Sequence, residues 1–207
     1  MTAGASADGE PPAGPRVSGV LRITTPVRTE RLTLRPFTEG DLDALYAYQS
    51  DPEVVRYMYW DVRDREQVAE QLTKRLTQDR LDDQHDYLAL AVVPDDVGHA
   101  VGELILRWTS PEHRQGEVGF AFGTGFQGRG YATEAAEAML ALAFRDLGLH
   151  RVFGRCDPRN TASVKVLERL GMRLEAHFRQ NEIFKGEWGD ELYYAILEDE
   201  WAARRLV

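Results

Sequence analysis

Apolar side chains recur along the chain at two spacings, and each spacing predicts a different kind of element. Leu32 and Leu34 alternate with polar neighbours, which is typical of a half-buried strand, whereas Ala135, Met139 and Leu142 follow a helical period. Turn residues separate the strand-like runs from one another. By these patterns we expect strands at 31–35, 86–93, 100–107, 116–122, 151–156, 172–178 and 191–197.

Capping residues mark where the helices between these strands begin and end. Thr38 followed by Asp41 predicts a short helix, and Asp64 with Gln67 forms a capping-box pattern ahead of a second one. Two further helices are expected at 132–147 and 160–170, stopped by Gly148 and Gly171. Helices interleaved with a mostly continuous sheet place the chain in the α/β (α+β) class with mixed strand directions.

The beginning of the sequence lacks these patterns. Its first nineteen residues contain no Leu, Ile, Phe or Trp and are rich in Gly, Pro, Ala and Ser. Such a composition cannot offset the entropy of ordering the chain. We therefore expect a flexible tail at residues 1–26 and one folded domain at 27–207. The basic start and apolar stretch of a signal peptide are missing, which favours a cytoplasmic location.

Charge and composition exclude several classes of protein. The 34 acidic and 25 basic residues give a net charge of −9, which argues against a nucleic-acid binder. No apolar run is long enough to span a membrane, so no membrane partner is expected. Cys156 is the single cysteine, and the five histidines are widely spaced without nearby ligands, so we expect neither a disulfide nor a metal site.

The most informative segment is 115–133, where a strand ends, glycines follow in quick succession and a helix begins at once. Glycines let backbone amides turn inward, and a helix N-terminus attracts anions, so this turn favours a phosphate or diphosphate ligand. A plain strand-to-helix turn is the alternative. Gly123, Gly125 and Gly128 also match the dinucleotide fingerprint by letter, but the acidic residue that should end the next strand, Asp157, lies too far along the chain.

Residues 127–132, with the sequence QGRGYA, fit the Q/R-x-x-G-x-G/A signature of the GNAT acyltransferases. The segment 156–176 resembles the strand, helix and strand that follow this signature in the superfamily. Three other segments, at 29–45, 54–60 and 191–201, are similar to its subgroup of ribosomal-protein N-terminal (Rim-type) acetyltransferases. The chain thus resembles the family from 29 to 201. The resemblance implies a mixed central sheet of about seven strands, splayed between the fourth and fifth strands and flanked by about four helices.

The resemblance also implies that acetyl-CoA, as co-substrate, lies between the strands at 116–122 and 151–156. Asn160 would contact the cofactor arm, although a helix N-cap is the simpler interpretation of an Asn after a proline. Arg129 would add positive charge beside the phosphates, or it is a solvated surface residue. The full set of expected cofactor contacts is Val118, Gly119, Phe120, Gln127, Gly128, Arg129, Gly130, Tyr131, Ala132, Asn160 and Ser163.

Transfer to an amine requires a proton acceptor, and two carboxylates are candidates. Glu182 matches the position of a glutamate proposed for this role in the Rim-type subgroup. Glu103 is the rival, because strand alternation puts it on the same face as Val101 and Ile105. A surface carboxylate is the alternative for each. Ser163 would protonate the departing thiolate, or it satisfies the local backbone of its helix.

An aromatic cluster at 57–60 contains Tyr59 and Trp60, which form either core or the wall of an acceptor pocket. The expected activity is therefore acetyl transfer from acetyl-CoA to a primary amine, which is a protein N-terminus or a small molecule, by direct attack. Two alternatives remain open: a non-catalytic acyl-CoA-binding module, and an enzyme that uses a longer acyl-CoA. A homodimer is compatible with the resemblance.

Overall fold

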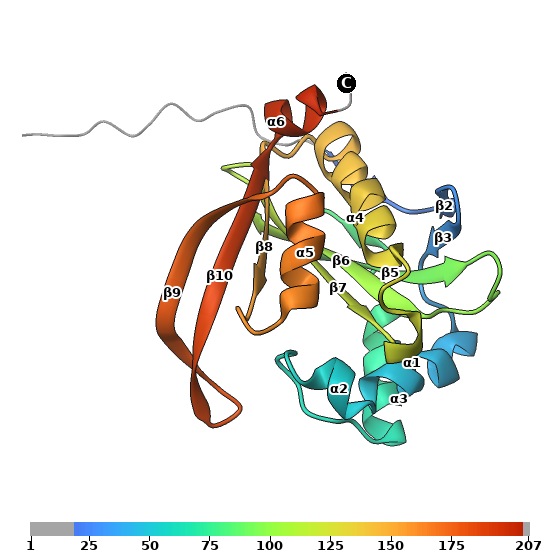
Figure 1. Cartoon of the computed structure of the whole chain (residues 1–207). Coiled ribbons are helices and arrows are strands. Elements are labelled where there is room, and N and C mark those ends of the chain that lie inside the picture. Colours follow the sequence, from blue (N-terminus) through green and yellow to red (C-terminus); the bar gives the residue numbers. More distant parts are fainter. Residues whose placement is uncertain (1–18, 205–207) are drawn as a thin grey trace, which may run out of the picture.

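Eight strands form the central sheet of the computed structural model, which describes residues 19–204 (Figure 1). Within these residues, neighbouring strands are antiparallel except for β7 and β8, which are parallel. Across the sheet the order is β2 (Val27–Arg28), β3 (Leu32–Arg35), β5 (Tyr87–Pro94), β6 (Gly102–Ser110), β7 (Gln115–Phe122), β8 (Arg151–Cys156), β10 (Glu187–Leu197) and β9 (Arg173–Phe184).

Helices cover both faces of this sheet. One face carries α1 (Leu42–Gln49), α2 (Pro52–Val55) and α3 (Arg65–Arg75), and the other carries α4 (Tyr131–Ala141) and α5 (Thr161–Arg169). The last helix, α6 (Glu198–Ala203), packs its Trp201 against Phe144. Shorter helical turns are η1 (Glu39–Asp41), η2 (Thr124–Phe126) and the π-turn η3 (Leu142–Asp146).

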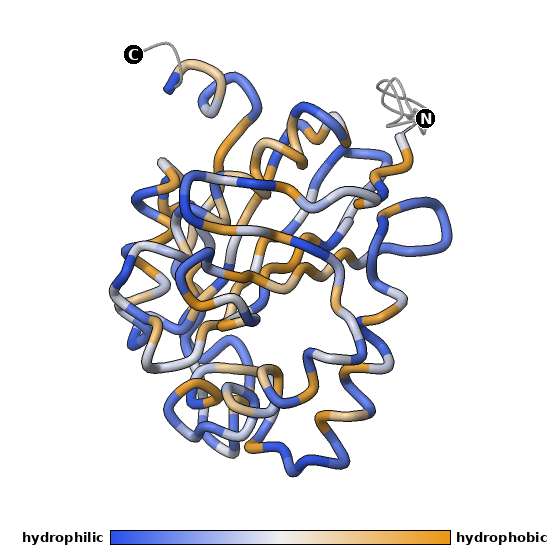
Figure 2. The backbone as a smooth tube through the Cα atoms, turned by 90° about the vertical axis from the view of Figure 1, so that its right-hand side faces the viewer, coloured by the Kyte–Doolittle hydropathy of each residue, from blue (hydrophilic) through white to orange (hydrophobic). Residues whose placement is uncertain are grey.

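Strand β5 shows why the sheet is buried on both sides. Leu88, Leu90 and Val92 belong to the core beneath α4 and α5, whereas Ala89 and Ala91 belong to the core beneath α1 and α3. Alternate residues therefore serve two cores, and the strand is apolar throughout. Figure 2 shows the same distribution, with hydrophobic residues along the central strands and hydrophilic residues in the outer loops.

The folded part begins earlier than the expected boundary at residue 26. Strand β1 (Leu21–Arg22) pairs with β4 (Arg80–Leu81), and the side chains of Leu21 and Ile23 are buried. The prediction of a flexible tail is therefore wrong for residues 21–26. Leu21 pairs with Leu81 and Ile23 N donates to Asp79 O, and local composition does not reveal contacts with such distant residues. The rest of the predicted tail, residues 1–18, lies outside the described residues.

The expected α/β class and mixed sheet are confirmed: residues 19–204 form eight strands in the main sheet and six α-helices, instead of about seven and about four. The elements α2 and β2 were too short to give a periodic signal. Strand β9 continues to Phe184 instead of ending at 178, and most of its residues are exposed. Because both of its faces carry polar residues, no hydrophobic alternation marks its second half. Glu182 consequently lies on a strand.

The splay between the fourth and fifth predicted strands is confirmed. Strands β7 and β8 pair only at 115–117 and 151–153, after which their register ends. On its other side, β7 stays paired with β6 along its length. Gly154, on β8 just beyond the last pair, lies under Leu167 of α5, where an added Cβ would come within 2.6 Å of the leucine Cδ2.

We predict that Gly154→Val destabilises the protein by about 1–3 kcal/mol, because the new side chain overpacks the contact between α5 and β8. Gly40→Ala is the matched control, since an added Cβ there would meet only Thr38 Oγ1, at 3.8 Å. Urea unfolding of both variants measures the effect. Equal unfolding midpoints would show that α5 does not depend on this close approach.

Candidate active site

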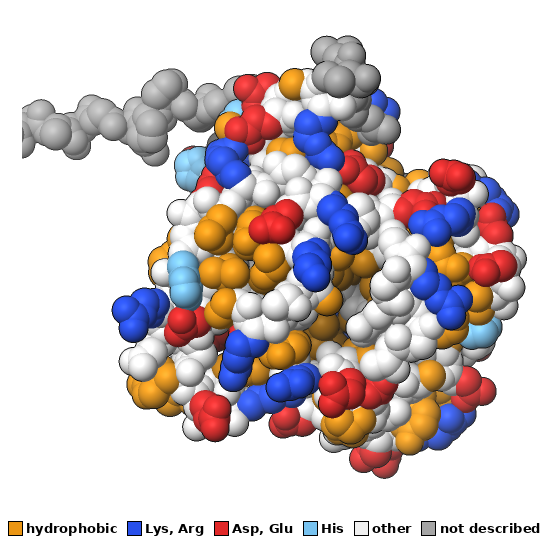
Figure 3. Space-filling model, in the orientation of Figure 1, with side chains coloured by type: hydrophobic (Ala, Val, Ile, Leu, Met, Phe, Trp, Pro, Cys, Tyr) orange, Lys and Arg blue, Asp and Glu red, His pale blue; other side chains and the backbone are white. Residues whose placement is uncertain are grey.

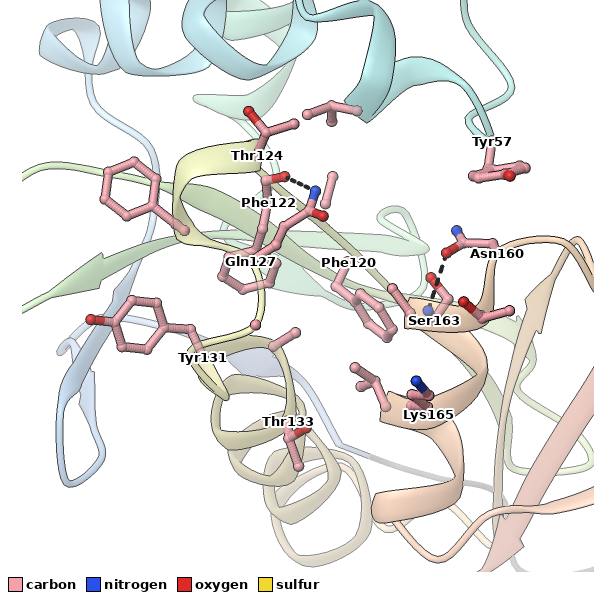
Figure 4. A pocket seen from close by; sticks show the side chains of 18 of the residues that line it. Tyr57, Phe120, Phe122, Thr124, Gln127, Tyr131, Thr133, Asn160, Ser163 and Lys165 are labelled. Atoms are coloured by element: carbon pink, nitrogen blue, oxygen red, sulfur yellow. Dashed lines mark hydrogen bonds between the residues drawn. The ribbon is translucent and has the colours of Figure 1, made fainter.

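A cleft of about 660 Å³ lies between the end of β7, the turn before α4 and the start of α5 (Figure 4). Its walls come from the end of β7, the turn before α4, the first turns of α5 and the α2 segment. Phe120 points into the space between α4 and α5, and Asn160 and Ser163 lie at the start of α5. The cleft therefore joins segments that are far apart in the sequence.

The glycine-rich turn forms one wall of the cleft. Gly128 and Gly130 have φ of +74° and +83°, a conformation that favours glycine, and an added Cβ at Gly128 would meet nothing within 4 Å. Gln127 closes the turn by donating from Nε2 to the Phe122 carbonyl at 3.0 Å. Its side chain thus shapes the turn, while the turn's open backbone surface faces the cleft.

Three features of this wall fit a diphosphate group. The first hydrogen bond of α4 runs from Glu134 N to Gly130 O, so the amides before Glu134 have no partner inside the helix. The positive end of the helix dipole lies at the same place. Thr133 Oγ1, also in the cleft lining, is buried without a hydrogen-bond partner among residues 19–204. Tyr131 and Ala132 complete this part of the lining.

Glu134 holds the turn in place from behind. Its carboxylate accepts hydrogen bonds from Thr29 Oγ1 at 2.6 Å and from the Arg31 backbone and side chain at 2.8 and 2.7 Å. Burial raises the pKa of Glu134, but the hydrogen bonds from Thr29 and Arg31 lower it by more, so the pKa lies below its ordinary value. Arg31 also donates to the Arg129 carbonyl at 3.1 Å. The turn is thereby fixed to the segment between β2 and β3.

Arg129 itself is exposed, lies over the Phe126 ring at 5.4 Å and is absent from the described lining of the cleft. Asn160 caps α5, because its Oδ1 accepts from Ser163 N at 3.1 Å. The N-cap interpretation of Asn160 is confirmed, and its side chain also lines the cleft. A cofactor contact by either residue stays a prediction.

A second cavity, of about 240 Å³, adjoins the first on the side of α1–α3. Val118, Gly119 and Phe120 run along it, and their backbone edges toward β8 lie beyond the last pair between the two strands. Tyr59 and Trp60 line its far wall. The residues shared by both cavities are Tyr57, Met58, Phe120, Ala121, Asn160 and Ser163.

Glu103 lines the smaller cavity but is already paired. Its Oε2 accepts from Arg75 Nε at 2.7 Å, and the two residues are only 2% and 8% exposed. Burial lowers the pKa of the Arg75 guanidinium, and attraction to Glu103 more than offsets this, leaving the pKa above its ordinary value. The expected inward placement of Glu103 is confirmed. Because Arg75 holds its carboxylate, Glu103 forms a buried ion pair in the cavity wall.

Glu182 lies outside the lining of both cavities and is joined to the smaller one through Tyr59. The Tyr59 hydroxyl is 2.7 Å from Glu182 Oε1 and 2.9 Å from Glu191 Oε1. Loss of hydration, followed by these two hydrogen bonds, raises the pKa of Tyr59 above its ordinary value. One hydroxyl has one proton, so Tyr59 donates to one of these carboxylates at a time.

The sequence alone assigns no role to Glu191, yet this carboxylate is 4% exposed and contacts three residues of the site. It accepts hydrogen bonds from Arg155 Nη1 at 3.1 Å and Asn181 Nδ2 at 2.9 Å in addition to Tyr59. Arg155 also donates to Glu117 Oε1 at 2.8 Å. Glu117, Arg155, Asn181 and Glu191 lie on four different strands, so the sequence spacing does not predict that they meet.

Cys156 lies in the lining of the smaller cavity. Burial raises the pKa of its thiol to about 12, helped by the negative charges of Asp157 and Glu191. The thiol therefore stays protonated near neutral pH, which makes it a poor nucleophile. Among residues 19–204 no group of three or more His, Cys, Asp and Glu side chains could hold a metal ion, and no helix could cross a membrane.

The fold and this site define an acyltransferase of the GNAT type, and comparison with known proteins gives the family. The acetyltransferase (GNAT) domain model matches residues 31–173. The N-acetyltransferase YnaD of Bacillus subtilis is 34% identical over 175 residues, covering 84% of this chain and 98% of the relative. The chain belongs to the GNAT acetyltransferase family and is an N-acetyltransferase.

Solved structures agree with this assignment. A GNAT acetyltransferase from Bacillus anthracis is 33% identical, with a TM-score of 0.75, and covers 85% of this chain and all of its own. RimL, a ribosomal L7/L12 α-N-protein acetyltransferase in complex with coenzyme A, is 20% identical, with a TM-score of 0.73, and covers 84% of this chain and 98% of its own. At that identity it shows the fold alone, so the Rim-type subgroup expected from the sequence is not established.

We predict that Arg75→Met destabilises the protein by about 3–5 kcal/mol, because Glu103 would be left buried and unpaired. The double variant Arg75→Met, Glu103→Leu removes both charges and should recover most of that loss. Urea unfolding of wild type, single and double variants tests this. A single variant as stable as the wild type would show that Glu103 does not need the arginine.

Proposed function

We propose that the protein transfers an acetyl group from acetyl-CoA to a primary amine by direct attack of the amine on the thioester. The observation that carries the proposal is the meeting of the two cavities at Ser163 and Asn160, beside the free edge of β7. The larger cleft suits the co-substrate, and the smaller cavity suits the amine acceptor. A single point where both are reached is what a direct transfer requires.

In this proposal the turn at 127–132 binds the diphosphate through its backbone amides, as its glycines and the start of α4 allow. The backbone of Val118, Gly119 and Phe120 pairs with the pantetheine arm in the manner of an added strand. Asn160 keeps its capping bond to Ser163 N while its amide faces the arm. Acetyl-CoA supplies the acetyl thioester.

The acceptor arrives as an ammonium and must lose a proton before it can attack. We assign Glu182 as the proton acceptor, reached through the Tyr59 hydroxyl in the cavity wall. Glu103 is the weaker candidate, since Arg75 already stabilises its charge. Ser163, at the junction of the cavities, donates the proton that the departing thiolate takes up as the C–S bond breaks.

A non-catalytic acyl-CoA-binding module is disfavoured by the same geometry. Such a module would leave the carboxylates facing bulk solvent, whereas Glu103 is buried in the smaller cavity and Glu182 is held by Tyr59. A coenzyme A release assay with a panel of amines, including peptides with different first residues, tests the activity. Thiol release dependent on an amine supports it, and its absence with every amine would contradict it.

The acceptor is either a protein N-terminus or a small amine, and the walls of the smaller cavity suit both. Tyr59 and Trp60 offer aromatic surface, and Arg155 lies 5.8 Å from the Tyr59 ring centroid. RimL, which shares the fold, acts on a ribosomal protein. Peptide substrates should therefore be placed first in the amine panel.

We predict that Glu182→Gln lowers kcat about a hundredfold and leaves CoA affinity unchanged, because it removes a proton acceptor and no cofactor contact. Steady-state thiol release and calorimetry measure the two quantities. Glu112→Gln, an exposed glutamate in the turn after β6, is the control. Full activity of Glu182→Gln would move the role to Glu103 or to water.

We predict that Gly130→Asp abolishes CoA binding, because it places a carboxylate against the diphosphate. Gly148→Asp is the matched control, since Gly148 also has a positive φ (+71°) and an added Cβ would meet nothing within 4 Å. Calorimetry with CoA, after circular dichroism confirms folding, separates the two. Unchanged CoA affinity in Gly130→Asp would disprove the phosphate role of the turn.

A further inference from the structure

The charged side chains that line the larger cleft are mostly basic, although the chain as a whole carries a net charge of −9. Among residues 19–204, Glu53 is the only acidic residue in its lining. Figure 3 shows a hollow in this face of the molecule, with basic side chains gathered over α5 beside it. The basic lining residues are Arg56, Arg159, Lys165 and Arg169.

Two of these four cations are already engaged. Arg159 forms a forked ion pair with Asp157, with its Nη2 2.6 Å from Oδ2, and Arg56 lies over the Tyr57 ring at 5.3 Å. Within residues 19–204 the Lys165 ammonium and the Arg169 guanidinium have no ion pair and no hydrogen bond. These two side chains are therefore available to an anion in the cleft.

Their spacing on α5 is mildly unfavourable unless an anion lies between them. Lys165 and Arg169 are four residues apart, so they lie on one face of the helix, where like charges repel each other. Glu168 does not relieve the repulsion, because the Tyr194 hydroxyl approaches it at 3.5 Å from the sheet side. A bound anion between the two cations would remove this repulsion.

We propose that Lys165 and Arg169 bind the 3′-phosphate of coenzyme A and so determine its selection over dephospho-CoA; this inference rests on the proposed function. The diphosphate has the amides of the turn before α4, and α5 faces that turn across the cleft (Figure 4). The 3′-phosphate is a separate monoester with close to two negative charges at neutral pH. Two unpaired cations on the opposite wall match that charge.

Calorimetry with CoA and with dephospho-CoA tests the assignment. We expect the wild type to bind CoA at least about tenfold more tightly than dephospho-CoA. The double variant Lys165→Gln, Arg169→Gln should bind both ligands with the affinity that the wild type has for dephospho-CoA. The control Lys74→Gln, Arg179→Gln makes the same change in net charge at exposed positions outside the cleft and should keep the preference.

Two outcomes would overturn the inference while leaving the proposed function intact. One is a wild type that binds CoA and dephospho-CoA equally. The other is a double variant that loses affinity for both ligands to the same extent, which would show that the two cations bind the diphosphate. A wild type that binds neither ligand would instead contradict the proposed function itself.

Discussion

The parting of β7 from β8 after three residue pairs is the constraint on which the rest of the site depends. Unpaired backbone groups inside a protein are costly unless water or a ligand takes their hydrogen bonds. The edge of β7 at 118–120 is therefore prepared for a partner that the fold does not supply. The turn before α4 and the first turn of α5 stand on the two sides of the same opening, so one separation creates all three walls.

Charge is distributed to suit this opening. The chain is acidic overall, yet the larger cleft is lined by four basic side chains and by the N-terminal turn of α4, both of which favour an anion at short range. Glu103 lines the smaller cavity and Glu191 contacts the lining residues Tyr59 and Arg155, and each of these buried carboxylates has an arginine partner. The arginine partner offsets part of the free-energy cost of burying each carboxylate. The net charge of the chain predicts neither the basic residues of the larger cleft nor the paired carboxylates near the smaller cavity.

Much of the fold could be predicted from the sequence because its signals are local. Alternation in β7, the glycines with positive φ at 128 and 130, and the capping Asn160 each act within a few residues of their own position. Elements without such signals were missed or misplaced. The pairing of Leu21 with Leu81 and the extension of β9 to Phe184 depend on contacts with distant segments.

The sequence by itself determined the class of fold, the family signature at 127–132 and the carboxylates worth considering. Only the tertiary structure decided their states: that Glu103 is held by Arg75, that Glu182 reaches the cavity through Tyr59, and that Lys165 and Arg169 remain unpaired among the described residues. The physical reason is that local preferences act along the backbone. Ion pairs and cavity walls form between segments that meet only when the sheet closes over its two cores.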